Sequence, residues 1–330
     1  MFRILYGTKI DFMRHWKRAA IGTTTFIVLG MIALGVRGLN ESIEFTGGTL
    51  VQLHFSEPPG IDVVRAAAAD AGFPRAEITQ FGPPTEFTVK TAALEGEAAA
   101  NPDSTAALMA GAIGQRLPGT AVEVVRSEAV GPRVGRELRR NATIAILISF
   151  AVVLVYLAIR FDWRFGLAAV LATAHDLIST IAFLAMMRLE VSLTVVAALL
   201  TVVGYSLNNT IVIFDRVREN LRKQRKESLR EVLNRSINET LPRSVLTHTT
   251  TFAATLTLLL FAGEVIRPFS WIMAFGITTG TFASLFLAGP LLLWIEHRWP
   301  PAANTERKGA ARALAEERRR ERSGATAATR

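Results

Sequence analysis

The sequence predicts a polytopic α-helical membrane protein with six transmembrane helices and an α+β domain between the first and second helix. Half of the 330 residues are hydrophobic, and they are gathered into six long blocks. One long segment of mixed polar character separates the first block from the second. A helix needs about 20 apolar residues to cross a bilayer, and each block approaches or exceeds that length.

The predicted spans are, in order, 19–36, 141–159, 165–187, 191–214, 244–263 and 269–295. The first begins after a basic stretch that contains Lys9, Arg14 and Lys17. No small-residue cleavage site follows this span. We therefore interpret it as a retained membrane helix and not as a signal peptide.

Basic residues predict the orientation of the chain. The loop 215–243 and the tail 296–330 are rich in arginine, and cytoplasmic segments carry an excess of Lys and Arg. Six spans place both termini on one side, so we expect residues 1–18, the loop and the tail in the cytoplasm. One group of arginines before the second span runs against this rule: Arg133, Arg136, Arg139 and Arg140. Long domains translocate largely regardless of charge, so the orientation is kept.

The outward segment 37–140 is predicted to be a periplasmic α+β domain. Strands are expected at 49–55, 77–82, 85–91 and 121–130, and helices at 62–72 and 104–116. This β-α-β-β-α-β order suggests a ferredoxin-like sandwich. Gly47 and Gly48 stand where the first span leaves the membrane. We favour a hinge or docking turn there over a ligand loop, because glycine permits positive φ and close backbone approach.

Composition and motifs exclude several functions. The absence of cysteine excludes disulfides and thiolate metal sites. The net charge of +9 suggests nucleic acid, but the positive mean hydropathy argues against an ordinary soluble binder. P-loop, HExxH and GxSxG motifs are absent, and neither Asp176 nor Asp215 belongs to a GxGD motif. We therefore expect no enzyme activity, no catalytic residues, no cofactor and no metal.

Polar residues inside the spans are the candidate functional groups. Asn208 and Asn209 lie inside the fourth span, where unpaired amides are costly. Asp176, in the third span, is interpreted either as a structural group bonded to a neighbouring helix or as a proton relay. His248 can titrate near neutral pH, although a helix-contact histidine is favoured. Asp215 lies two turns from Asn208, which suggests one polar membrane face, with an interfacial ion pair for Asp215.

Two further patterns concern helix packing. Gly276, Gly280 and Ser284 recur at four-residue intervals in the sixth span, so helix backbones can approach closely there, within the bundle or against a partner. Residues 227–244 carry an apolar stripe beside basic residues, which predicts a helix on the inner membrane surface. We favour lipid contact for it over a binding site on a partner. Pro242 is then expected to mark the start of the fifth span.

Five motifs occur in an order that resembles the SecF family of protein translocase subunits, within the resistance-nodulation-division superfamily. They are FTGGT, VGPRVGREL, GYSLNNTIVIFDRVREN, LPRSVLTHTTT and GITTGTFASLFLAGP. The resemblance covers about residues 10–297. It implies an inner-membrane subunit that pairs with SecD and helps SecYEG export unfolded preproteins, driven by the proton or sodium gradient. Membrane lipids are further expected partners, and YajC is another candidate.

Position 209 departs from the family pattern. The family usually has an aspartate where Asn209 stands, and the resemblance implies that it relays protons near an arginine that corresponds to Arg243. An amide does not titrate, although it can hydrogen-bond like a protonated Asp. Three explanations stay open: SecD carries the coupling, another residue such as Asp176 or His248 carries it, or the chain is a non-titrating structural half. A small-molecule exporter of the same superfamily is a rival, but such exporters usually hold both halves in one chain.

Overall fold

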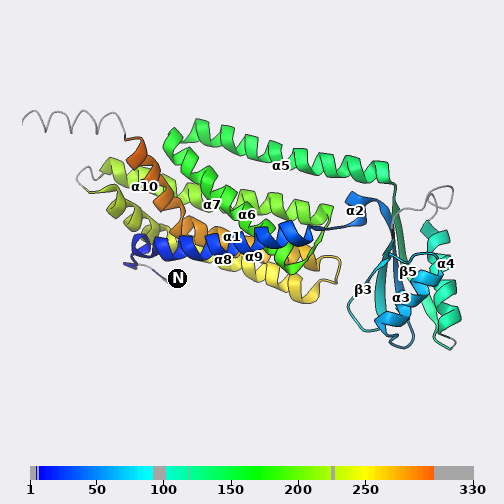
Figure 1. Cartoon of the computed structure of the whole chain (residues 1–330). Helices are drawn as coiled ribbons and strands as arrows, with labels where there is room; N and C mark the ends of the chain where they lie inside the picture. Colours follow the sequence, from blue (N-terminus) through cyan, green and yellow to red (C-terminus); the bar gives the residue numbers. More distant parts are fainter. Residues whose placement is uncertain (1–4, 6, 92–101, 118, 224–226, 301–330) are drawn as a thin grey trace, which may run out of the picture.

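The computed structural model describes residues 5, 7–91, 102–117, 119–223 and 227–300, so the tail beyond residue 300 lies outside the described residues (Figure 1). Six described helices are long and apolar enough to cross a membrane. They are α1 (Phe12–Arg37), α5 (Pro132–Arg160), α6 (Trp163–Met187), α7 (Leu193–Lys223), α8 (Leu229–Phe261) and α9 (Arg267–Phe286). The protein is therefore a multi-pass helical membrane protein.

Helices α7 and α8 extend well beyond their apolar blocks. Most of the basic segment 215–243 is helical, because α7 continues to Lys223 and α8 already begins at Leu229. A capping box fixes that start: Ser228 and Glu231 each satisfy a backbone N–H of the other. The expectation that a helix starts at Pro242 is wrong, because Pro242 lies inside one continuous α8.

The sixth predicted span is broken. Helix α9 ends at Phe286, and a separate α10 (Ala288–Arg298) follows. Pro290 has no N–H to donate to the carbonyl of Phe286, so one hydrogen bond of the helical ladder is missing where α9 and α10 meet. In the first turn of α10 the same missing N–H costs little.

The helices form a central group with flanking members. Helices α6, α7 and α9 are the most enclosed. In the apolar 18-residue stretch of each, 56% of the residues are buried, against 6% in α1 and in α5. In Figure 1, α5 runs along one edge of the group. The interior is filled by aliphatic and aromatic side chains, among them Phe165 and Phe214, whose rings meet edge to face. A buried centre therefore lies between α6, α7 and α9.

The α+β domain lies at the end of the helices opposite the N-terminus (Figure 1). Its elements are β2 (Gly48–Phe55), α3 (Ile61–Asp70), β3 (Glu77–Gln80), β4 (Glu86–Thr91), α4 (Pro102–Arg116) and β5 (Val122–Val130). The strands form an antiparallel sheet in the order β3-β4-β2-β5. Alternate residues of β2, such as Val51 and Leu53, are fully buried in the core that α3 and α4 share with the sheet.

Short elements attach this domain to the helices. They are β1 (Asn40–Glu41), α2 (Ile43–Thr46) and β6 (Glu190–Val191), and β1 pairs with β6 in parallel. Lys90 of β4 forms a 2.8 Å ion pair with Glu190. The carboxylate of Glu44 accepts a 2.6 Å hydrogen bond from the backbone N–H of Leu193, at the start of α7. The attachment thus holds the domain at the ends of α6 and α7.

Candidate functional site

Asn209 lies at the centre of a polar cluster between three helices. Its side chain, on α7, is only 6% exposed. Its amide nitrogen donates to the hydroxyl of Ser284 on α9. Its amide oxygen accepts from the hydroxyl of Ser244 on α8, at 2.6 Å. The amide is therefore hydrogen-bonded at both ends, which removes most of the cost of burying it.

The small residues of α9 make this contact possible. A Cβ atom built on Gly276 would lie within 3 Å of the Val202 side chain, and one on Gly280 would lie 3.0 Å from Cβ of Ser206. Helices α7 and α9 are therefore in close backbone contact, and Ser284 comes within reach of Asn209 one turn further on. Of the two expected packing partners, the structure places this stripe against α7, inside the bundle.

Asp176 of α6 forms a second buried contact with α7, through Ser206. The carboxylate is 1% exposed and accepts a hydrogen bond from the hydroxyl of Ser206. Its other oxygen lies 3.2 Å from Nδ1 of the adjacent His175. Ser206 lies one turn before Asn209, so the carboxylate on α6 and the amide on α7 belong to one polar centre.

A small cavity opens beside this centre. It measures about 80 Å³ and is lined by Tyr205, Asn208, Asn209, Val212, Arg243, Ser244, Thr247 and His248. His248 is buried, with Nδ1 2.6 Å from the carbonyl oxygen of Ser244. Arg243 is exposed, and no ion pair joins it to any other residue that the structure describes. The cavity thus brings Arg243, His248 and Asn209 together.

Asn208 and Asp215 have different surroundings in the structure. Asn208 is exposed and lines the mouth of the cavity. Asp215 lies two turns further along α7 and forms a 2.8 Å ion pair with Arg160, at the end of α5. Asp215 thus forms an ion pair, and its partner comes from another helix.

Gly47 and Gly48 lie where the α+β domain meets α5. Both have positive φ, +73° and +140°. A Cβ on Gly47 would fall 2.8 Å from Cα of Pro132, and one on Gly135 would fall 3.0 Å from the carbonyl oxygen of Phe45. The FTGGT and VGPRVGREL motifs therefore pack backbone to backbone. A side chain at Gly47 or Gly135 would push the two segments apart.

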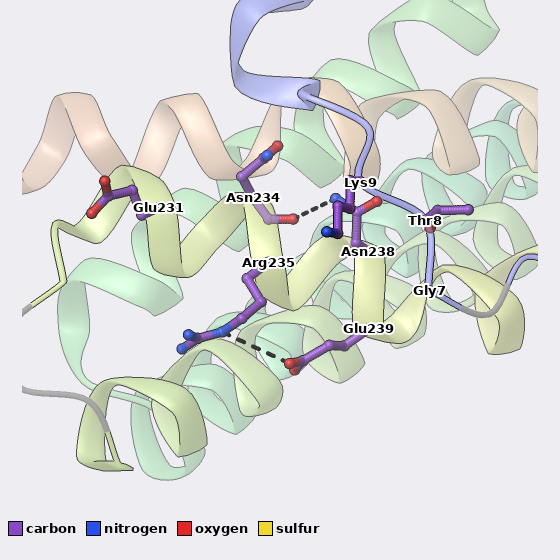
Figure 2. A pocket seen from close by; sticks show the side chains of 8 residues that line it. All are labelled: Gly7, Thr8, Lys9, Glu231, Asn234, Arg235, Asn238 and Glu239. Atoms are coloured by element: carbon purple, nitrogen blue, oxygen red, sulfur yellow. Dashed lines mark hydrogen bonds and ion pairs between the residues drawn. The ribbon is translucent and has the colours of Figure 1, made fainter.

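The sequence interpretation missed a clamp on the N-terminal segment, formed by Asn234 and Asn238, which Figure 2 shows beside residues 7–9. Asn238 of α8 accepts from the N–H of Ile10 at 2.9 Å and donates to its carbonyl oxygen at 2.8 Å. Asn234 accepts from the N–H of Phe12 at 2.8 Å. The cavity beside the clamp, about 420 Å³, is also lined by Lys9 and by Arg235 and Glu239, which form an ion pair. One signal in the sequence could have pointed to this contact. Asn234 and Asn238 lie one turn apart in a helix, and Asn is a poor helix former, so a pair of them suggests a role in hydrogen bonding.

The serine partners were also missed, apart from Ser284, which was assigned to packing. Ser206 lies in the fourth predicted span, and Ser244 is the first residue of the fifth. A buried amide or carboxylate requires hydrogen-bond partners. That requirement could have pointed to these hydroxyls as a group, although not to the pairing.

The fold and the polar centre define the class of the protein: a multi-pass helical membrane protein with a buried polar cluster shared between helices and one attached α+β domain. The family model "Protein export membrane protein SecD/SecF, C-terminal" matches residues 113–298. The model "SecD/SecF GG Motif" matches residues 32–59, which include Gly47 and Gly48.

Individual relatives agree. The chain is 55% identical over 304 residues to Protein translocase subunit SecF of Gemmatimonas aurantiaca, which covers 91% of each chain. It is 38% identical to Protein translocase subunit SecF of Escherichia coli O157:H7, over 87% of this chain and 88% of the relative. The crystal structure of SecDF, a translocon-associated membrane protein from Thermus thermophilus, superposes with a TM-score of 0.81 at 35% identity. That match covers 90% of this chain and 40% of the SecDF chain. The chain belongs to the SecF family.

Proposed function

We propose that the chain is the SecF half of a SecD–SecF unit that helps SecYEG export unfolded preproteins across the bacterial inner membrane. The observation that carries this proposal is the match of 90% of the chain, at a TM-score of 0.81, to a translocon-associated SecDF. The chain spans about two-fifths of that protein, so a SecD-like chain is the natural source of the remaining helices.

The orientation follows from charge. The N-terminal segment, the α7–α8 end and the tail lie in the cytoplasm, because they hold most of the basic residues. The α+β segment then faces the periplasm as a ferredoxin-like domain, since its strand order matches the β-α-β-β-α-β plan. We assign it a mechanical role and no enzymatic one.

Ion coupling has two candidate locations. Asn209 cannot release a proton, so the step that the family usually places at this position is carried by SecD or by another group of this chain. Among the described residues Asp176 is the one buried Asp or Glu, and ionisable residues inside membrane spans are functional candidates. We favour SecD as the carrier, with Asp176 as the structural partner of Ser206.

The test uses export in inverted inner-membrane vesicles, with and without an uncoupler. Extracts in mild detergent should contain the chain in a complex with a SecD-like protein, and depletion of the chain should slow export. Recovery of the chain as a stable monomer, with normal export in its absence, would contradict the assignment.

A variant pair separates the two coupling locations. Asp176→Asn removes the ionisable group and keeps its shape, whereas Asp162→Asn removes a carboxylate from the loop between α5 and α6. If SecD carries the coupling, both variants keep the response of the parent to the uncoupler. If only Asp176→Asn loses that response, Asp176 is the relay.

A further inference from the structure

Three of the four arginines that run against the charge rule line an open cavity where α5 meets the α+β domain. The cavity measures about 670 Å³. Its lining residues are Phe45, Thr46, Arg136, Arg139, Arg140, Thr143 and Ile144. Cationic and apolar side chains thus share one cavity, on a helix of which little is buried.

Two of the three guanidinium groups have no countercharge among the described residues. Arg139 forms an ion pair with Glu41 of β1. No ion pair joins Arg136 or Arg140 to any residue that the structure describes, and both are exposed. They lie four residues apart on one helix face, where like charges repel each other. An anion bound between them would remove this repulsion.

The position of Arg140 along α5 places it at a membrane interface. Residues 141–159 contain no charged side chain, and Arg160 follows at the other end. At 1.5 Å per residue, Arg140 and Arg160 are separated by about 30 Å along the helix, which is the thickness of a bilayer core. Arg136 and Arg140 therefore lie at headgroup level, in the leaflet on the side of the α+β domain.

An apolar surface runs from the cavity toward the middle of the membrane. The exposed side chains on α5 include Ile144, Leu147 (64% exposed), Ile148, Val152 and Val155. Ile144 belongs both to this surface and to the cavity lining. A ligand with a charged head and a long apolar chain therefore matches the cavity and the helix face together.

We propose that this cavity binds the phosphate of an anionic phospholipid of the phosphatidylglycerol type, with an acyl chain lying along α5. Guanidinium groups bind phosphate oxygens in pairs of parallel hydrogen bonds, which a lysine cannot do. The site accounts for arginines at a membrane interface where the charge rule predicts few. It does not depend on the translocase assignment.

The experiment measures lipid binding to the purified full-length chain by native mass spectrometry. The probes are dioleoylphosphatidylglycerol, zwitterionic dioleoylphosphatidylcholine and inorganic phosphate. The variant is Arg136→Gln with Arg140→Gln. Its control is Arg65→Gln with Arg75→Gln, which removes the same charge from exposed positions of the α+β domain.

We expect the anionic lipid to bind the parent and the control equally, and the Arg136/Arg140 variant about tenfold more weakly or worse, since hydrogen bonds to charged groups are the strong ones. Zwitterionic lipid should bind weakly to all three proteins. Equal binding of the anionic lipid to the variant would overturn the proposal. So would inorganic phosphate binding as tightly as the lipid, because the apolar surface would then contribute nothing. A variant that keeps the lipid but loses a copurifying protein would likewise refute it and would assign the arginines to a protein contact.

Discussion

Replacing Asn209 by leucine tests whether the buried amide holds the helices together. Leucine has nearly the same size but forms no hydrogen bond, so it removes the bond to Ser284 on α9 and the bond to Ser244 on α8. Ser284 still donates to the carbonyl oxygen of Thr281 at 2.9 Å. Ser244 loses its acceptor and must turn to a carbonyl of its own helix.

The magnitude follows from these two bonds. Hydrogen bonds between membrane helices contribute about 0.6 kcal/mol on average and up to about 1.7 kcal/mol. Two of them give a destabilisation of about 1–3 kcal/mol for Asn209→Leu. Asn208 provides a matched control on the same helix, because it is exposed. We expect Asn208→Leu to change the free energy of unfolding by less than about 0.5 kcal/mol.

Asn209→Asp can keep both contacts, since a carboxylate accepts from Ser244 and also from Ser284 once the Ser284 hydroxyl turns away from the carbonyl oxygen of Thr281. The aspartate can also ionise, because Arg243 lines the same cavity and a nearby opposite charge favours the charged form. We therefore expect this variant to be tolerated and to make export more dependent on the proton gradient than in the parent.

The assay combines unfolding of the purified chain in detergent with export rates in vesicles, with and without an uncoupler. An Asn209→Leu protein as stable as Asn208→Leu would show that the amide only fills space. An Asp variant that responds to the uncoupler as the parent does would show that position 209 is not on the coupling route.

Three further changes test other contacts. Arg243→Met should slow export more than Asp162→Asn, and equally small effects in vesicle assays would show that Arg243 is only a positive anchor at the membrane surface. Gly280→Val should destabilise the chain by about 1–3 kcal/mol in detergent unfolding, since even a Cβ atom at this position would lie 3.0 Å from Cβ of Ser206. Gly204→Val, where nothing lies within 4 Å, should lack this packing cost, and equal losses would contradict close α7–α9 packing. Asn238→Leu removes two hydrogen bonds to Ile10 and should speed proteolysis of the N-terminal segment, whereas an unchanged rate would show that the clamp does not restrain it.

The sequence alone determined the number of spans and the family. Blocks of about 20 apolar residues can be stabilised only by crossing a bilayer, so composition along the chain suffices to count them. The order of elements in 37–140 was also predictable, because each strand and helix has its own local periodicity. The ends of the helices were not predictable from hydropathy. Helix α8 continues through Pro242 and starts at the Ser228 capping box, which an apolar count does not register.

The partners of the polar residues were decided only by the tertiary structure. Asn208 and Asn209 are adjacent and identical in type, yet one is exposed and the other bridges two helices. Likewise, Asp215 pairs with Arg160 rather than with the arginines beside it in sequence. A helix turns by about 100° per residue, so adjacent side chains face different neighbours. Which helix lies on each side depends on the packing of α7 against Gly276 and Gly280, contacts between residues far apart in the chain.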